Sequence, residues 1–309
     1  MICVILLLII LILIFLWIYR TAFFSNPHGR KEDIHAIPSG EQYLHQRDRM
    51  HSLIDDLDRI PFEPVEIRSF DGLLLRARYY HKSDSAPVEI EFHGYRGSAI
   101  RDFCGGARIG LRKGHNILLV DQRTQGRSEG RTITFGIRER FDVLSWIDYV
   151  RKRLGEDVPI ILAGVSMGAA TVIMATGLDL PENVCGVVAD CPYSSPEAII
   201  QVVCGKMRLP VRLAMPMVRL VARVCGFSLR AASAVEAVKN GRTPVLIIHG
   251  EDDRFVPCDM SREIAAAGKR VQLETFPGAG HGLSYMVDTQ RYEHCVEMFV
   301  DECLKNQMR

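Results

Sequence analysis

Residues 158–171 read VPIILAGVSMGAAT, and the rest of the chain is most simply explained around this stretch. The apolar run ending at Val165 predicts a strand buried on both faces. The Ala/Met/Ile-rich segment from Met167 to Leu178 predicts a helix packed on that strand. Ser166 falls on the junction between them. The stretch therefore predicts a strand-turn-helix unit of an α/β fold.

A serine at such a junction sits on a sharp turn that only small flanking residues allow, so Gly164 and Gly168 are expected to be steric requirements. The Ser166 hydroxyl would then project from the carboxyl edge of the sheet. The backbone N–H of Met167, at the helix start, would face a developing oxyanion. Because G-x-S-x-G is a short pattern, a helix-capping serine after a buried strand is the alternative interpretation.

Composition sets wide limits on fold and partners. A chain of 309 residues with 48% hydrophobic and 24% charged residues fits one α/β domain with additions. The formal net charge of +1 argues against nucleic-acid binding. The nine cysteines are scattered and include no zinc-type C-x-x-C pair, which favours free thiols in a reducing compartment and no structural metal. The exterior of an anaerobe would permit free thiols as well.

The N-terminus carries an uncharged apolar run from Ile2 to Tyr19, closed by Trp17 and Tyr19 before Arg20. This run is long enough to cross a bilayer, and its terminal aromatics suit a membrane interface. A cleaved signal peptide is the alternative, but it would need a basic segment before the run and a small-residue cleavage site after it. We therefore expect residues 1–20 to be an uncleaved transmembrane anchor.

The positive charges nearest to this run, Arg20, Arg30 and Lys31, all lie on its carboxyl side. The positive-inside rule then predicts a membrane protein whose main domain is cytoplasmic, in agreement with the free thiols.

Residues 21–62 are predicted to be a juxtamembrane linker followed by an amphipathic helix. Ser39 and Gln42 have capping-box spacing, and apolar residues continue at helical spacing to a stop at Pro61. This helix is expected to pack on the domain or on the membrane surface. Residues 63–309 then form the main domain.

Asp71-Gly72 is a hairpin signal between two predicted strands, residues 65–70 and 73–81. Beyond it strands and helices alternate, which predicts right-handed crossovers and a mostly parallel sheet with helices on both faces. Further strands are expected at residues 88–93, 117–121, 160–165, 184–190, 245–249 and 271–276. Helices are expected at residues 98–113, 137–153, 167–178, 258–268 and 284–304.

A nucleophilic Ser166 needs a base that is oriented by a carboxylate, and in this architecture the chain order is serine, acid, histidine. Acidic residues 251–253 follow the strand at 245–249, and His281 lies in a glycine-rich loop after the strand at 271–276. Each group comes at the carboxyl end of a strand, where ligands bind in such sheets. This coincidence favours a catalytic site over a capping serine.

Residues 63–305 resemble the serine α/β-hydrolases of the esterase/lipase-like superfamily, and in particular their membrane-anchored bacterial members. The family's G-x-G-H pattern falls on Gly278, Gly280 and His281. Its G-x-x-D-x-x-V-P pattern falls on Gly250, Asp253, Val256 and Pro257. The resemblance therefore implies that Asp253, and not the adjacent Asp252, is the acid of a Ser166–His281–Asp253 triad. His249, at the end of a buried strand, is expected to be a hydrogen-bonded structural residue.

The resemblance also implies that a second oxyanion donor comes from the loop after the strand that ends in His93 and Gly94. We expect this donor to be the Tyr95 N–H, with His93 and Gly94 shaping the turn. Arg96 is either a solvated loop charge or a contact for a substrate carboxylate or head group. Residues 121–130 resemble the family's D-x-R-G-x-G-x-S loop, but Thr124 replaces a usual glycine, which puts the expected pocket shape in doubt.

Residues from about 193 to 242 exceed an ordinary crossover and are predicted to form a cap with helices at 194–207 and 211–224. Residues 198–235 contain six basic side chains and no acidic one, and are otherwise markedly apolar. A basic amphipathic lid near an anchor suits an enzyme that takes substrate from an anionic bilayer, with methionines lining an acyl pocket. The alternative is a cap core with solvated charges.

The sequence thus predicts a membrane-anchored serine hydrolase that cleaves carboxylic esters or thioesters of small-molecule, acyl or lipid-like substrates. His281 would act as the base, and neither a metal nor an organic cofactor is required. A peptidase or acyltransferase on the same triad is the alternative among enzymes. A non-catalytic, membrane-anchored binding protein is the alternative outside them. The pattern indicates neither the acyl length nor the oligomeric state.

Overall fold

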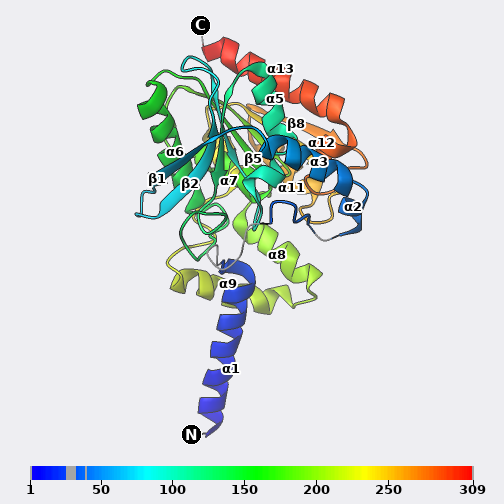
Figure 1. Cartoon of the computed structure of the whole chain (residues 1–309). Coiled ribbons are helices and arrows are strands. Elements are labelled where there is room, and N and C mark those ends of the chain that lie inside the picture. Colours follow the sequence, from blue (N-terminus) through cyan, green and yellow to red (C-terminus); the bar gives the residue numbers. More distant parts are fainter. Residues whose placement is uncertain (1, 26–32, 39, 308–309) are drawn as a thin grey trace.

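The computed structural model describes residues 2–25, 33–38 and 40–307. Within these residues eight strands form one sheet in the order β1-β2-β4-β3-β5-β6-β7-β8 (Figure 1). β2 is antiparallel to both β1 and β4, and all neighbours from β4 to β8 are parallel. The predicted mostly parallel sheet is therefore confirmed. The strands are β1 (Glu63–Arg68), β2 (Leu74–Tyr80), β3 (Val88–Phe92), β4 (Asn116–Asp121), β5 (Ile160–Val165), β6 (Val184–Asp190), β7 (Val245–Gly250) and β8 (Val271–Phe276).

The central strands are mostly apolar because both faces of the sheet are covered, with the buried Glu89 and Glu91 of β3 as exceptions. In β5, Ile161 and Ala163 pack into one hydrophobic cluster, whereas Ile160 and Leu162 pack into another on the opposite face. This division follows from the two-residue period of a strand. The carboxyl end of β5 is thereby held between two packed layers.

Helices cover both faces of the sheet. α6, α7, α10 and α11 supply residues to one cluster, and α3, α4, α5, α12 and α13 supply residues to the other. The helices are α1 (Ile2–Ile18), α2 (Glu41–Leu44), α3 (Arg47–Asp58), α4 (Ala99–Asp102), α5 (Gly106–Lys113), α6 (Glu139–Leu154), α7 (Met167–Ala175), α8 (Pro196–Lys206), α9 (Val211–Val224), α10 (Ala234–Asn240), α11 (Cys258–Ala267), α12 (Ser284–Val287) and α13 (Thr289–Gln307).

Two predicted helices are divided. The helix expected at 98–113 forms as α4 and α5, and the helix expected at 284–304 forms as α12 and α13. The first break lies at Gly105, where an added Cβ would fall 2.4 Å from the ring of Tyr285. Tyr285 of α12 therefore packs directly against the break between α4 and α5.

The helical cap is shorter than the predicted segment of residues 193–242. Only α8 and α9 stand away from the sheet, whereas α10 supplies Ala234, Ala237 and Val238 to a cluster on the sheet face. Ala237 also lies against Gly177, just beyond α7. The apolar side chains of α10 thus make it part of the main domain.

α1 projects from the body of the molecule beside α9 (Figure 1). The helical segment Ile2–Phe23 is long and apolar enough to cross a membrane, and it is almost entirely exposed. Signal sequences can have the same length and composition. Its last turn, Tyr19–Phe23, is a π-helix. Arg30, Lys31 and Ser39, which entered the predictions of orientation and capping, lie outside the described residues. All nine cysteines lie within them, and each is a free thiol.

Candidate active site

Ser166 lies on a strained turn between β5 and α7. Its φ and ψ angles are 54° and −112°, a conformation that L-residues rarely adopt. A Cβ on Gly168 would fall 1.8 Å from the carbonyl oxygen of Phe92, and one on Gly164 would fall 2.4 Å from the backbone of Gly168. Both glycines are therefore required sterically, as the sequence predicted.

Ser166, His281 and Asp253 form one hydrogen-bonded chain. The Oγ of Ser166 is 3.0 Å from Nε2 of His281, and Nδ1 of His281 is 2.6 Å from Oδ2 of Asp253. Asp253 follows β7 and His281 follows β8, so all three groups come from the carboxyl edge of the sheet. With the proton of His281 on Nδ1, Nε2 is free to accept the hydroxyl proton of Ser166.

The Asp253 carboxylate is held by the surrounding backbone. Its Oδ1 accepts the N–H groups of Phe255 and Val256 at 2.7 and 2.8 Å. Burial by itself would raise the pKa of Asp253, but hydrogen bonds from His249 and His281 outweigh it and hold that pKa well below its usual range. Asp252 is exposed and makes no such contact with His281.

His249 is a buried second partner of the acid. Its Nε2 lies 3.2 Å from Oδ2 of Asp253 and 3.0 Å from the carbonyl oxygen of Val256, and its Nδ1 lies 2.6 Å from Oγ of Ser261. These contacts are consistent with an Nε2–H donor and an Nδ1 acceptor. His249 thus orients Asp253, which is more specific than the structural role predicted for it.

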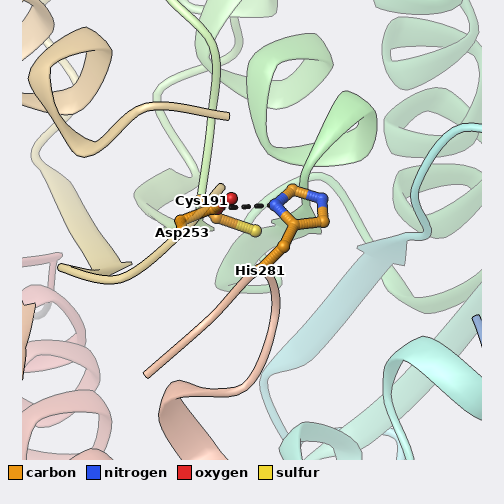
Figure 2. Close-up of side chains that lie close together, drawn as sticks. All are labelled: Cys191, Asp253 and His281. Atoms are coloured by element: carbon orange, nitrogen blue, oxygen red, sulfur yellow. Dashed lines mark hydrogen bonds and ion pairs between the residues drawn. The ribbon is translucent and has the colours of Figure 1, made fainter. Parts of the chain in front are cut away.

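Cys191 lies beside Asp253 and His281 (Figure 2), and one ligand atom from each residue falls within 4.8 Å of the others. A metal site would require a thiolate and a free imidazole nitrogen. Burial raises the pKa of the Cys191 thiol well above its usual range, with Asp190 and Asp253 adding to the shift. Nδ1 of His281 is already bonded to Asp253. This cluster therefore suits a neutral thiol packed against the acid better than a metal centre.

The loop after β3 approaches Ser166 from the other side. A Cβ on Gly94 would fall 3.4 Å from Cβ of Ser166, and the N–H of Gly94 donates to Oδ2 of Asp102 at 2.8 Å. Within the described residues, neither the N–H of Tyr95 nor that of Met167 has a hydrogen-bond acceptor. The two N–H groups predicted as oxyanion donors therefore make no competing hydrogen bond within the described residues.

His93 fixes the shape of this loop from within. Its Nδ1 lies 2.9 Å from the carbonyl oxygen of Gly94, and its Nε2 accepts the N–H of Gln122 at 3.1 Å. The loop at 121–130 therefore supports the site through His93. Thr124, which replaces a family glycine, takes a left-handed φ of 71° that glycine favours.

Arg96 makes contacts that neither of the two expected roles includes. Its Nη2 group donates to the carbonyl oxygens of Arg20, Thr21 and Phe24, at 3.2, 3.1 and 2.8 Å. Arg96 is therefore bonded to the end of the N-terminal helix, although its side chain is exposed and also lines the cavity at Ser166.

A cavity of about 400 Å³ opens at Ser166 and runs along the sheet face that α3, α5, α12 and α13 cover. No cap residue lines it, so the predicted methionine-lined pocket under the cap is not this cavity; Met215 is instead buried in the core of the cap. The apolar lining of the cavity includes Tyr43, Met50, Phe103, Ile109, Met286 and Val296. The hydroxyl of this Tyr43 donates to the carbonyl oxygen of His281 at 2.8 Å.

Sequence analysis missed the part that α2 and α3 play in this site. The apolar spacing of residues 43–57 indicates a helix with a buried face, but not which cavity that face closes. Tyr43 and Met50 close the cavity beside Ser166, while Arg49 ties α3 to the carbonyl oxygen of Met286 at 2.7 Å. The segment packs on the domain, which was one of the two placements expected for it.

Buried carboxyl groups also line the cavity, among them Asp190 and Glu91. Burial raises the pKa of Asp190 to about 6, although His249 and the Tyr292 hydroxyl favour its charged form. Burial raises the pKa of Glu91 well above its usual range, and the neighbouring Glu89 adds to the shift. Oε2 of Glu91 has no hydrogen-bond partner within the described residues. Its surroundings therefore favour the neutral acid over the carboxylate.

Glu91→Gln should remove a pH-dependent loss of stability. The pKa of Glu91 is higher in the folded than in the unfolded protein, so the wild type loses about 1.4 kcal/mol per pH unit as the pH rises between the two values. Glutamine has no proton to lose. The gap in Tm between the variant and the wild type should widen in favour of the variant from pH 5 to pH 8. A gap in Tm that stays constant over this range would contradict a raised pKa of Glu91 in the folded protein.

Known proteins resemble this chain over part or most of its length. The uncharacterised protein YqkD of Bacillus subtilis is 22% identical over 259 residues, which cover 83% of this chain and 85% of YqkD. The thiohydrolase aneE of Aspergillus aculeatus is 30% identical over 142 residues, which cover 44% of this chain and 43% of that protein. The esterase Pf2001 of Pyrococcus furiosus superposes with a TM-score of 0.62 at 23% identity, over 80% of this chain and 94% of that one.

The esterase likeness shows the same fold. A family model described as the alpha/beta hydrolase family matches residues 92–293, which span the strands and loops that carry Ser166, Asp253 and His281. This match covers more than half of the sequence. The chain therefore belongs to the alpha/beta hydrolase family.

Proposed function

We propose that this protein is a serine hydrolase that cleaves carboxylic esters or thioesters of acyl or lipid-like substrates. The observation that carries the proposal is the hydrogen-bonded chain from Ser166 Oγ through His281 to Asp253. The N–H groups of Met167 and Tyr95, which have no acceptor within the described residues, add to it. A serine hydroxyl is a weak nucleophile without such a base. Membership of the alpha/beta hydrolase family supports hydrolysis in general.

In the proposed reaction, His281 takes the proton from Ser166 as its Oγ attacks the acyl carbonyl. The N–H groups of Met167 and Tyr95 bind the resulting oxyanion, and the loss of one such donor typically costs about 3 to 4 kcal/mol. His281 then protonates the departing oxygen or sulfur, which leaves an acyl-enzyme. Water, activated again by His281, attacks this intermediate and releases the acid.

The cavity beside Ser166 supports an acyl substrate. Its walls combine aromatic and aliphatic side chains with several charged ones, among them Arg101 and Asp190, so an acyl chain would lie along the apolar part of the lining, which includes Tyr43, Met50, Phe103 and Met286. An esterase among the structures of the same fold and a thiohydrolase among the relatives suggest both an ester and a thioester as the scissile group.

A panel of substrates tests this function. Full-length protein in detergent should hydrolyse p-nitrophenyl esters and matched thioesters with a burst of acyl-enzyme, and turnover should rise with acyl length until the cavity is filled. The matched anilides should react far more slowly. Comparable anilide turnover would favour a peptidase, and transfer to an added alcohol in preference to water would favour an acyltransferase. Folded protein that neither turns over any ester nor reacts with a fluorophosphonate would favour the non-catalytic binding protein.

We propose further that α1 is an uncleaved membrane anchor and that the domain is cytoplasmic. Phe23, at the end of the apolar segment, is fully buried in the domain, which is expected of a retained helix and not of a segment removed by cleavage. The nine free thiols support a reducing compartment.

The proposed placement brings α9 close to the membrane, because α9 contacts α1. Leu213, Leu220 and Val224 are exposed on α9. The basic charge of the cap is smaller than its sequence suggested, because Arg219 and Arg230 both pair with Glu197. Exposed Arg208, Arg212 and Arg223 remain to attract anionic lipid.

Leu213→Asp with Leu220→Asp should raise the KM for an ester held in anionic vesicles by roughly tenfold, since both changes remove apolar contacts with the bilayer. The kcat on a water-soluble short ester should not change, because neither side chain lines the cavity at Ser166. Met298→Asp, at an exposed position of α13, is the matched control. An equal loss on both substrates would indicate a damaged site, and no loss on vesicles would contradict the bilayer contact.

A further inference from the structure

The N-terminal helix does not end in a free linker. Phe23 is fully buried, with its ring 5.9 Å from that of Phe135 and 5.5 Å from that of Phe227. Phe24 forms an antiparallel bridge with Thr132, and the N–H of Ile133 donates to the carbonyl oxygen of Phe23 at 2.7 Å. The end of the helix is therefore built into the domain.

Two adjacent side chains of the loop after β3 bond to this end. The Tyr95 hydroxyl donates to the carbonyl oxygens of Thr21 and Ala22, at 3.2 and 2.9 Å. Arg96 donates to three carbonyl oxygens of the same turn. These are the backbone acceptors that a helix leaves unsatisfied at its C-terminus, where positive charge is also favoured. Tyr95 and Arg96 thus cap the N-terminal helix.

The conformation of these two residues is constrained on several sides. The Tyr95 ring stacks on Phe135 with centroids 5.3 Å apart, and the Arg96 guanidinium lies 5.0 Å from the centroid of the Tyr95 ring. The backbone of Arg96 has a φ of 50°, which residues other than glycine adopt infrequently. The hydrogen bonds of the Arg96 side chain to the carbonyl oxygens of residues 20, 21 and 24 are among the contacts that restrain it.

The loop that carries these residues also reaches the nucleophile. Gly94, one residue before Tyr95, lies against Ser166, and its N–H donates to Asp102. Tyr95 lines the same cavity as Ser166. The Tyr95 N–H is a proposed oxyanion donor, and such a donor must be placed within about 0.5 Å to be effective. In this proposal Tyr95 holds the helix end with its side chain and supplies the donor from its backbone.

We infer that the end of the N-terminal helix is part of the catalytic framework, and that Tyr95 and Arg96 are positioning residues that couple its attachment to the geometry of the oxyanion hole. The inference rests on the proposed function, because it concerns a donor of that reaction. It assigns the apolar helix a second role besides attachment to a membrane. A domain whose helix end is detached would retain the nucleophile but hold the oxyanion loop less firmly.

The test is the full-length double variant Tyr95→Phe with Arg96→Met, which keeps the ring, the apolar stem and both backbone N–H groups. We expect kcat on a short soluble ester to fall about tenfold, part of the 10²- to 10³-fold effect of losing a whole donor, while KM stays within about twofold. The affinity for an alkylboronic acid, whose tetrahedral adduct on serine places an oxygen in the oxyanion hole, should fall by the same factor.

Tyr79→Phe with Arg138→Met is the matched control, since it deletes a tyrosine hydroxyl contact with His81 and an arginine bond to the carbonyl oxygen of Gly226. This control should leave kcat unchanged. If the double variant does not fold, Tyr95→Phe alone tests the same point through the hydroxyl. Unchanged kcat and boronate affinity in a folded variant would overturn the inference. An inactive, unlabelled wild type would instead overturn the proposed function.

Discussion

Ser166→Ala should lower kcat by about a million-fold, down to the slow hydrolysis that binding and oxyanion stabilisation alone support. The variant should also lose all labelling by a fluorophosphonate. Both effects follow from the geometry, because Ser166 Oγ is the atom that lies 3.0 Å from Nε2 of His281. In-gel fluorescence of the full-length protein and ester turnover measure the two effects.

Ser145→Ala is a suitable control for that experiment. Ser145 is a partly buried serine on α6 whose hydroxyl donates to the carbonyl oxygen of Phe141, and it does not line the cavity at Ser166. It should label and turn over like the wild type. Labelling that persists in Ser166→Ala would show that another residue is the nucleophile.

Asp253→Asn should lower kcat by about 10⁴-fold, the loss typical of a triad whose acid is replaced by an amide. The amide can donate to Nδ1 of His281, which would move the imidazole proton to Nε2, where it cannot accept the hydroxyl proton of Ser166. The fold should persist, because Oδ1 can still accept the N–H groups of Phe255 and Val256. Stopped-flow or steady-state ester turnover with a parallel Tm measurement checks both points.

Asp252→Asn provides a neighbouring control for this change. Asp252 is exposed, and its backbone N–H, which donates to the carbonyl oxygen of Ala279 at 3.0 Å, would not be altered. Its activity should match that of the wild type. A large loss in Asp252→Asn with little effect of Asp253→Asn would refute the choice between the two acids.

The fold and the arrangement of the three candidate catalytic residues could be predicted because they depend on short-range patterns. A buried strand can be recognised from an apolar run such as residues 160–165. The sharp turn after it can be recognised from Gly164 and Gly168, because a Cβ atom at either position would clash with the backbone. The carboxyl ends of parallel strands meet at one edge, so residues that follow β5, β7 and β8 come together whatever the details of packing.

Other features depended on which distant segments pack together. Nothing within a window around Arg96 indicates that its partners are the carbonyl groups of residues 20–24, because backbone acceptors have no signature in sequence. The same holds for Tyr43, which lines the cavity and bonds to the carbonyl oxygen of His281. The sequence by itself determined the sheet, the turn and the chain order of the candidate site. Only the tertiary structure decided which segments enclose the site, because contacts across 70 to 240 residues arise from packing and not from local sterics.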